Sequence, residues 1–483
     1  MWDKICRITE FLWGTPLIAL MIGVGLYLTI GTGLFQITGI GRWWKKTVGE
    51  IFGKTSKVGS GGKGELTPFQ TISTVLAGTV GSGNIAGVSA AIAIGGPGAV
   101  FWMWIIAIVG MMTKMAEVTL SVAFRKQDSN GEFFGGPMHY MRQGLGKTGL
   151  ILAGVYAAAL FVEVCADACF VQVNTLAVCV NDVYGETIRF GLGSFGESAE
   201  MAVRTFFGNT NLDLPMLLIG LIVVTISFII VQTGGIRTIG GFCEKMVPSM
   251  IVIYLIACIG VVICNLGKVP EAFGMIFRFA FAPAPAIGGF TGATVSLAMA
   301  RGASRGIFSN EAGMGTAATV HATARTDHPA HQGMYGILEV FVTIIVCTLT
   351  ALTVICSGVW CNGQTGVELT FDGFELVWGR IGIVILSISV FLFTFSSYIG
   401  FYVEFRTCVE YLFGKKALKW IKYLFFILPI LAVTLEVEQV WDIADIAVGF
   451  IVLPNMIALI ALSPKFFKLF KEYKSQADFS SRH

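Results

Sequence analysis

The sequence TVLAGTVGSGNIAG (residues 74–87) lies in the middle of a long apolar run and contains four glycines. Small residues let membrane helices pack closely, so the glycines alone favour tight packing. The GSGN cluster (residues 81–84) indicates more, because it weakens a helix enough to unwind it. Irregular backbone is tolerated in a membrane only where it is buried in protein or lines a cavity. We therefore predict a broken helix, with carbonyls of residues 77–80 free for a cation and the amides of Ser82 and Gly83 free for a carboxylate.

The rest of the chain has the composition of an integral membrane protein. Of its 483 residues, 55% are hydrophobic and 13% are charged, and the mean hydropathy is +0.76. A helix of about 20 apolar residues spans a bilayer. Eleven such runs occur, at residues 14–37, 68–94, 98–124, 149–180, 213–232, 247–266, 273–300, 334–358, 376–403, 418–434 and 440–463. The sequence therefore predicts an all-α integral membrane protein with about 11 transmembrane helices.

The positive charges predict how these helices are oriented. Most of the 33 Lys and Arg residues lie in the tail and in the loops after the first, third, fifth, seventh and ninth runs. Cytoplasmic loops carry an excess of positive charge, so we predict a plasma-membrane protein with its N-terminus outside and its C-terminus in the cytoplasm. The first inner loop contains Arg42, Lys45, Lys46, Lys54, Lys57 and Lys63. Its RWW start predicts a short helix at the membrane surface, with a solvated basic loop as the alternative.

A second interruption is predicted in the seventh run, at FAPAPAIGGFTG (residues 281–292). Proline removes a backbone donor and clashes with the preceding helical turn. The alternative is a loop before a shorter helix that begins near Ile287. The second and seventh helices are five apart and are predicted to cross in opposite directions. Such paired interruptions favour a transporter built from inverted repeats, with its site near the middle of the membrane.

Five strings closely resemble the alanine or glycine:cation symporter family. They are GTVGSGNIAGV (78–88), GGPGAVFWMW (95–104), GGPM (135–138), RGIFSNEAGMG (305–315) and LPNMIA (453–458). The resemblance covers nearly the whole chain. It implies a leucine-transporter-like fold, a 5+5 inverted repeat preceded by one extra helix.

The resemblance also divides the chain. The extra helix and a basic amphipathic cytoplasmic loop take residues 1–66. The first five-helix repeat takes residues 67–232 with 233–266, the second takes 267–463, and a basic cytoplasmic tail takes 464–483.

In that fold a sodium ion lies between the second and ninth helices. Neutral carbonyl and hydroxyl oxygens can replace its water without a carboxylate. The implied ligands are the carbonyls of Ala77, Val80 and Phe393 and the hydroxyls of Ser396 and Ser397. Hydroxyls in membrane helices also bond to a carbonyl of the preceding turn, which is the alternative for each of these side chains.

An amino acid is a zwitterion, so its site needs donors, acceptors and an apolar wall. Gln172 and Asn174 resemble a Gln-x-Asn element of the family's substrate site, and Phe290 is the candidate wall, although aromatic residues are more often only core. The predicted substrate-binding residues are Thr79, Ser82, Gly83, Asn84, Gln172, Asn174, Gly289 and Phe290.

Charged residues inside the predicted helices need partners, because a charge at the bilayer centre costs about 2.5–3.5 kcal/mol. Lys114 and Glu117 are one turn apart and are expected to pair. Glu163 and Asp167 share a helix face and repel each other. Either one of them holds a proton or they pair with a basic residue. Glu311 is expected in a cytoplasmic gate or loop brace.

Together these features predict a secondary active transporter and not an enzyme. We expect sodium-coupled symport of a small neutral amino acid into the cell by alternating access. Alanine or glycine follows from the resemblance, and serine or glutamine fits the same polar contacts. The alternatives are a proton-coupled amino acid symporter, a channel and a non-transporting sensor. The expected partners are the amino acid, Na+ and the lipid bilayer, with no nucleic acid, and the carrier is expected to work as a monomer.

Overall fold

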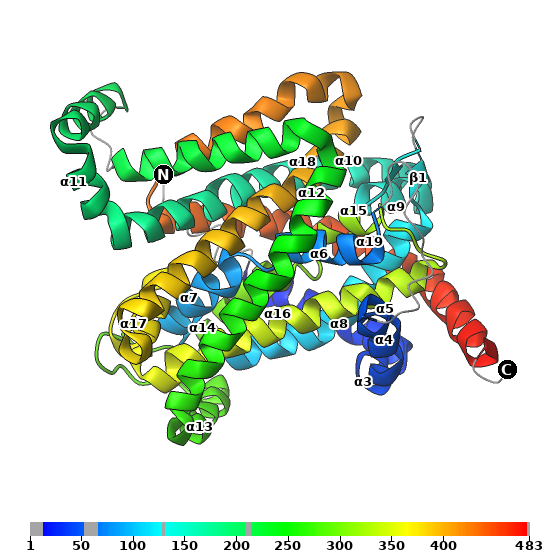
Figure 1. Ribbon diagram of the computed structural model, residues 1–483. Helices are drawn as coiled ribbons and strands as arrows, with labels where there is room; N and C mark the ends of the chain where they lie inside the picture. Colours follow the sequence, from blue (N-terminus) through cyan, green and yellow to red (C-terminus); the bar gives the residue numbers. More distant parts are fainter. Residues whose placement is uncertain (1–12, 53–65, 128–130, 208–213, 481–483) are drawn as a thin grey trace.

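The computed structural model describes residues 13–52, 66–127, 131–207 and 214–480, and these form an almost entirely helical protein (Figure 1). One short antiparallel hairpin pairs β1 (Lys126–Gln127) with β2 (Phe133–Phe134). The predicted loop residues Lys54, Lys57 and Lys63 lie outside the described residues.

The helices are bounded as follows. They are α2 (Thr15–Gly31), α3 (Phe35–Thr38), α4 (Ile40–Lys46), α5 (Val48–Phe52), α6 (Pro68–Thr79), η1 (Ser82–Asn84), α7 (Ala86–Gly95), α8 (Gly98–Ala123), α9 (Pro137–Gly144), α10 (Gly146–Val164), η2 (Cys165–Gln172), α11 (Val173–Phe207), α12 (Leu214–Cys264), η3 (Leu266–Lys268), α13 (Val269–Phe281), α14 (Val295–Asn310), α15 (Ala317–His321), α16 (Pro329–Ser357), η4 (Val359–Cys361), α17 (Gly366–Trp378), α18 (Arg380–Ala432) and α19 (Val437–Ser480). Of these, η1, η3 and η4 are 3₁₀ turns and η2 is a π-helix.

Seven helices in the described part of the chain are long and apolar enough to cross a membrane. They are Gly98–Ala123, Gly146–Ser194, Leu214–Gln232, Thr238–Cys264, Pro329–Ser357, Arg380–Ala432 and Val437–Gln476. The predicted runs 376–403 and 418–434 both fall in α18, which bends at Gly414 (φ 79°, ψ 165°). The run 14–37 contains a shorter apolar helix, Pro16–Gly31, and the run 68–94 is interrupted. The multi-pass all-α class is thus confirmed, and the number of crossings stays a prediction.

The predicted break in the second run is confirmed. Helix α6 ends at Thr79 and α7 begins at Ala86. Between them Val80 and Gly81 leave the helical region, with φ, ψ of −101°, 80° and −128°, −152°, and η1 makes one tight turn. The residues of the GSGN cluster have low helix propensity, which makes such a bend in the chain easier to form.

The predicted break at residues 281–292 is wrong. Helix α13 ends at Phe281, and an irregular loop then leads to α14. The loop is closed by two antiparallel bridges, Ala284 with Ala293 and Ile287 with Phe290. The prolines therefore end one helix before another begins, which is the alternative reading, although α14 begins at Val295 and not near Ile287.

The second interruption instead follows α14. Glu311 adopts a left-handed backbone (φ 52°), and Gly313 and Gly315 have φ of 99° and 77° before α15 begins. A left-handed conformation is strained for any residue with a Cβ, so Glu311 is held by its surroundings. The two interruptions of the fold are therefore residues 80–85 and 311–316.

The short surface helix predicted after Arg42 is α4, followed by α5. Trp43 is buried, with its ring 5.6 Å from that of Phe341, while Trp44 is exposed. In Figure 1, α4, α5, α9 and β1 lie to the right and α7, α13 and α17 lie to the left, with the long helices α8 and α16 between them. The elements predicted for each side of the membrane are thus grouped at opposite ends of the molecule.

Candidate functional site

Asn84 joins the first interruption to α14 and α16. Its amide nitrogen donates to the hydroxyl of Ser309 at 2.7 Å and to the sulfur of Cys347 at 3.4 Å. Its side-chain oxygen accepts from the amide of Gly81 at 3.0 Å, and its carbonyl accepts from Thr350 at 2.9 Å. Asn84 therefore holds the unwound segment against α14 and α16, a bonding role that a side chain with both donor and acceptor can fill.

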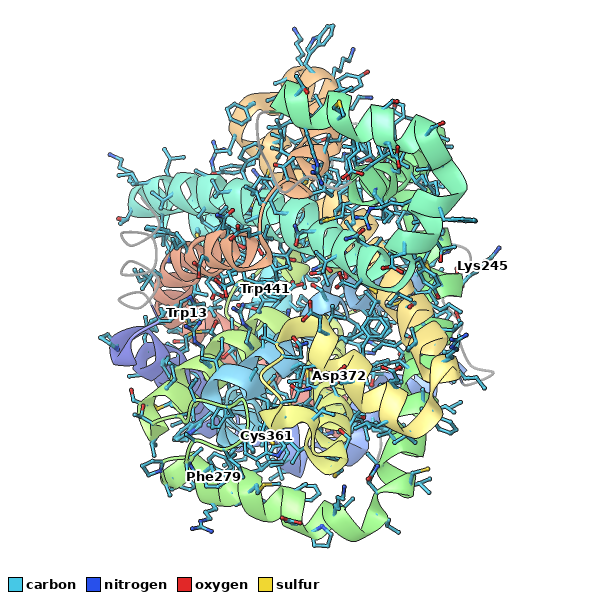
Figure 2. All side chains as sticks on the ribbon, turned by 90° about the vertical axis from the view of Figure 1, so that its left-hand side faces the viewer. Trp13, Lys245, Phe279, Cys361, Asp372 and Trp441 are labelled. Atoms are coloured by element: carbon cyan, nitrogen blue, oxygen red, sulfur yellow. The ribbon has the colours of Figure 1, made fainter. Side chains whose placement is uncertain are left out.

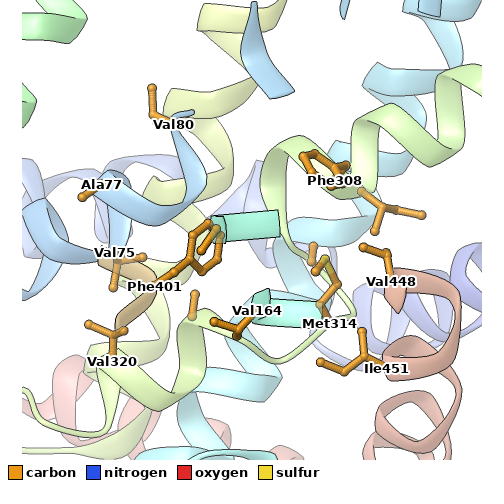
Figure 3. Close-up of a cluster of buried hydrophobic side chains, with 14 of the residues drawn as sticks. Val75, Ala77, Val80, Val164, Phe308, Met314, Val320, Phe401, Val448 and Ile451 are labelled. Atoms are coloured by element: carbon orange, nitrogen blue, oxygen red, sulfur yellow. The ribbon is translucent and has the colours of Figure 1, made fainter. Parts of the chain in front are cut away.

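Phe308 covers the unwound segment. A Cβ added to Gly83 would lie only 2.9 Å from the ring of Phe308, so the close approach requires glycine. The ring of Phe308 is 5.0 Å from that of Trp441. Figure 3 shows Phe308 and Met314 on one side of this apolar region, Ala77 and Val80 on the other, and Phe401 and Val164 between them. Phe308 is therefore an aromatic residue that contacts the first interruption, and no pattern in the sequence singled it out.

The structure does not bring Phe290 or Gly289 to the interruptions. The amide of Gly289 donates to the carbonyl of Cys361 at 2.6 Å, and the ring of Phe290 lies 5.4 Å from that of Trp360. In Figure 2, Cys361 lies toward one end of the molecule and Trp441 nearer its middle. The assignment of Gly289 and Phe290 to the site depended on the predicted break at residues 281–292, so the structure gives it no support.

Gln172 is at the unwound segment, as predicted. Its side-chain oxygen accepts from the amide of Ser82 at 3.1 Å, and its amide nitrogen donates to Asp167 at 2.6 Å. A Cβ added to Gly81 would clash with the hydroxyl of Ser397 and would lie 3.0 Å from the oxygen of Gln172, so glycine is needed at this position. The amide of Ser82, which is predicted to donate to the substrate carboxylate, thus already donates to Gln172. The buried hydroxyl of Ser82 has no partner among the described residues.

Two other predicted residues bond elsewhere. Asn174 donates to the carbonyls of Ala432 and Leu435 at 2.9 and 3.0 Å and so caps the end of α18, away from the interruptions. The hydroxyl of Thr79 donates to the carbonyl of Val75 at 3.2 Å, one turn earlier in its own helix. Both side chains are therefore used within the fold.

Of the side chains predicted to bind sodium, Ser397 connects α18 to α6. The hydroxyl of Ser397 donates to the carbonyl of Ala77 at 2.7 Å and approaches that of Gly78 at 3.2 Å. The hydroxyl of Ser396 donates to the carbonyl of Phe393 at 3.0 Å, within its own helix. All of these residues are buried, and Val80 lies at the end of α6. Neutral oxygens from two helices suit a monovalent cation. The hydroxyl oxygen of Ser397 can face such a cation once its O–H rotates away from the Ala77 carbonyl.

Lys114 does not pair with Glu117. Its ammonium lies 2.9 Å from Glu339, and the other oxygen of Glu339 lies 3.2 Å from His321. Glu117 instead accepts from the amide of Gly313 at 3.0 Å and from Asn455 at 2.6 Å. A buried carboxylate that accepts from a backbone amide fixes that backbone, so Glu117 braces the second interruption.

Glu311 lies within the second interruption and not in a cytoplasmic loop. One carboxylate oxygen accepts from the hydroxyl of Thr316, and the other is buried without a partner in the part of the chain described. A Cβ added to Gly78 would lie 3.7 Å from that second oxygen. The unpartnered oxygen of Glu311 is therefore close to the end of α6.

A buried ion pair closes one side of the site. Arg305 makes two bonds to Asp445, at 2.9 and 3.0 Å, and its guanidinium lies 4.3 Å from the ring centre of Trp441. Ser304 also donates to Asp445, at 3.2 Å. These side chains join α14 to α19 next to Phe308.

Backbone bonds close the other side. The amide of Leu66 donates to the carbonyl of Thr323 at 3.4 Å, and the amide of Arg325 donates to the carbonyl of Leu66 at 3.3 Å. The guanidinium of Arg125 donates to the carbonyls of Ala322 and Ala324 at 3.2 and 2.5 Å. The segment before α6 is thereby fixed to the segment after α15.

Comparisons with known proteins agree with this architecture. The model of the sodium:alanine symporter family matches residues 2–482. The transporter YflA of Bacillus subtilis (strain 168) is 36% identical over 473 residues, covering 97% of this chain and 92% of its own. The sodium/alanine symporter AgcS of Methanococcus maripaludis is 33% identical over 463 residues, covering 94% of this chain and 93% of its own. The crystal structure of MhsT in complex with L-phenylalanine matches with a TM-score of 0.57 at 17% identity, covering 83% of this chain and 90% of that chain, which confirms the leucine-transporter-like fold.

Proposed function

Because this chain belongs to the sodium:alanine symporter family, we propose that it carries a small neutral amino acid into the cell together with sodium. The observation that carries the proposal is the contact between the Ser397 hydroxyl and the Ala77 carbonyl at 2.7 Å, beside an interrupted helix. Alanine is the first candidate, because the relative AgcS is a sodium/alanine symporter. Glycine, serine and glutamine are the other candidates.

In this proposal the sodium ion lies among the carbonyls of Ala77, Val80 and Phe393 and the hydroxyls of Ser396 and Ser397. The ion supplies a positive charge that holds α6 against α18. By linkage, bound sodium raises the affinity for the amino acid, and bound amino acid raises the affinity for sodium by the same factor. Each inward sodium adds about 2.3 kcal/mol for every 100 mV of membrane potential.

The amino acid would lie between the two interruptions, against Phe308. The unpartnered hydroxyl of Ser82 can donate to its carboxylate, and the unpartnered oxygen of Glu311 can accept from its ammonium. The conformation of this segment is held by four residues, through the bonds and the close approach described above: Thr79, Gly83, Asn84 and Gln172. The proximity of Phe308 to Gly83 favours a small side chain.

Alternating access follows from the two closures. Opening on one side requires Arg305 to separate from Asp445. Opening on the other requires Leu66 to leave Thr323 and Arg325. We propose that the first closure faces outside and the second faces the cytoplasm, in agreement with the charge distribution, with the N-terminus outside and the carrier working as a monomer.

Uptake into proteoliposomes tests the proposal. A panel of labelled amino acids is offered with a gradient of sodium, of lithium or of protons alone. Saturable, sodium-driven uptake of alanine or glycine, with exchange against unlabelled substrate inside, is expected of this carrier. Uptake driven by protons alone would favour the proton-coupled alternative, and non-saturable flux without exchange would favour a channel. Absence of sodium-driven uptake for every amino acid in the panel would refute the proposal.

A further inference from the structure

Four buried carboxyl groups from four elements of the fold lie near one another. They are Glu163 of α10, Asp167 of η2, Glu311 of the second interruption and Glu404 of α18, and none is more than 3% exposed. They act on one another electrostatically. Buried carboxyl groups are rare in membrane proteins and each needs something that neutralises it.

Glu163 is the member of this group that lacks any bond. Both of its carboxyl oxygens are buried and without a partner among the described residues, and its residue is 0% exposed. One oxygen each of Glu311 and Glu404 is also without a partner. Elsewhere the same fold pairs its buried charges, as Arg305 with Asp445. The missing bonds of Glu163 therefore need an explanation of their own.

Among the described residues, the titratable groups around Glu163 are acidic or bonded elsewhere, except for His139, whose pKa burial lowers to about 4. Arg406, a cation on α18, is paired with Glu132 and Glu410. Glu163 interacts electrostatically with five of the titratable groups: Tyr156 on its own helix, Cys165 and Asp167 of η2, Glu311 and Glu404. From α9 and α19, which also pack on α10, the buried titratable groups are His139, Tyr140 and Asp445. Tyr140 donates to Asn455, and Asp445 is paired with Arg305. Lys114 acts on Glu311 and Glu404 but forms its ion pair with Glu339.

We propose that Glu163 is a proton-binding site of this carrier, which holds a proton in the closed arrangement and exchanges it with water when the second interruption moves. A carboxyl group in an apolar surrounding without a cationic partner takes up a proton in place of keeping its charge. On closing, a proton from water forms an O–H bond on the carboxylate. On opening, that bond breaks and the proton returns to water.

The structure links Glu163 to the moving part. Tyr156 lies two turns before Glu163 on the same face of α10, and its hydroxyl donates to the carbonyl of Met314 in the second interruption at 2.8 Å. Directly after Val164 the helix changes to the π-helix η2, a geometry that often marks functional sites. Motion of residues 311–316 would therefore change how much water reaches Glu163.

The proposal rests on the proposed function in one respect: amino acid binding is taken to be the event that closes the second interruption around Glu163. If binding adds a proton to Glu163, the affinity for alanine falls as pH rises, by at most tenfold per pH unit. A glutamine at position 163 is neutral like the protonated acid. The E163Q variant should therefore bind alanine at every pH about as tightly as the unchanged protein does at low pH.

Calorimetry on the purified full chain tests this linkage. Alanine is titrated in saturating sodium from pH 6 to 8.5, in two buffers with different ionisation enthalpies, which gives the number of protons taken up per alanine bound. We expect proton uptake and a pH-dependent affinity for the unchanged protein and for E163D, and neither for E163Q. The exposed Glu375 of α17 provides the matched control E375Q, which should behave like the unchanged protein.

The outcomes separate the two proposals. Alanine binding with no proton uptake in the unchanged protein, or with the same pH dependence in E163Q, overturns the proton site and leaves the symporter intact. If E163Q does not fold, the proton number of the unchanged protein and of E163D still decides. If no amino acid binds, the proposed function fails, and a titration with sodium alone in the two buffers tests the proton site. The absence of proton uptake there overturns it as well.

Discussion

Replacing Ser397 with alanine is the most direct test of the sodium site. The hydroxyl of Ser397 reaches across from α18 to the carbonyl of Ala77, whereas that of Thr394 donates at 2.7 Å to Val390 in its own helix. A hydrogen bond or ligand contact to a charged group contributes about 1.5–3 kcal/mol. Since 1.4 kcal/mol is a factor of ten, the sodium concentration for half-maximal uptake should rise about 10- to 150-fold in S397A.

The assay is the initial rate of alanine uptake into proteoliposomes as a function of sodium, with choline keeping the ionic strength constant. The T394A variant removes a hydroxyl from the same helix and should leave the sodium dependence unchanged. Sodium should also raise the melting temperature of the unchanged protein and raise that of S397A much less, because only binding to the folded state stabilises it. A sodium dependence in S397A within twofold of the unchanged protein, or an equal shift in T394A, would refute the assignment.

Three further predictions concern other parts of the fold. In D445N one carboxylate of a buried ion pair is lost and Arg305 is left uncompensated, so the free energy of unfolding should fall by about 3–5 kcal/mol, seen as a lower melting temperature. In G81A the new Cβ would clash with the hydroxyl of Ser397 and crowd the oxygen of Gln172 at 3.0 Å, so transport should fall by at least tenfold while the protein still folds, checked by uptake together with gel filtration. Burial lowers the pKa of His139 to about 4, so below pH 6.5 the folded protein binds fewer protons than the unfolded chain. The free energy of unfolding should therefore be at its full value above pH 6.5 and should fall by about 3 kcal/mol between pH 6.5 and 4. In H139F, thermal unfolding measured across the same pH range should show a smaller fall.

The first interruption was predictable because its cause is local. Four glycines within residues 74–87 lower the helix propensity, and the structure unwinds between Val80 and Ile85. The contact of Ser397 with the end of α6 follows from the resemblance to known transporters and not from spacing, since Ser397 and Ala77 are 320 positions apart.

The second interruption was not found because the composition favours the wrong segment. Prolines at 283 and 285 break helices more strongly than any residue near Glu311, but they do so outside a helix here. The actual break depends on tertiary bonds from Glu117 and Tyr156 to Gly313 and Met314. Gly313 and Gly315 after Glu311 are a local signal for this break, but a charged residue at that position also fits a water-exposed loop.

Long-range pairing explains why Lys114 and Asn174 bond to partners that their spacing does not indicate. Lys114 and Glu117 have the spacing of a helical ion pair, yet Lys114 bonds to Glu339, 225 positions away in the sequence. Asn174 has the position of a substrate ligand and bonds instead to the end of α18. Sequence spacing shows which side chains share a face, but packing between helices decides which of them meet.

The two closures differ in kind, and this has a kinetic consequence. The closure at Arg305 and Asp445 consists of side chains, which change rotamer on a nanosecond scale once water enters. The closure at Leu66 is made by main-chain bonds to Thr323 and Arg325, so a whole helix with its preceding segment must shift, a collective motion of microseconds to milliseconds. In the proposed transport cycle, release of the amino acid past Leu66 is therefore expected to be the slower half of each turnover, and cooling should reduce the turnover rate mainly through that step.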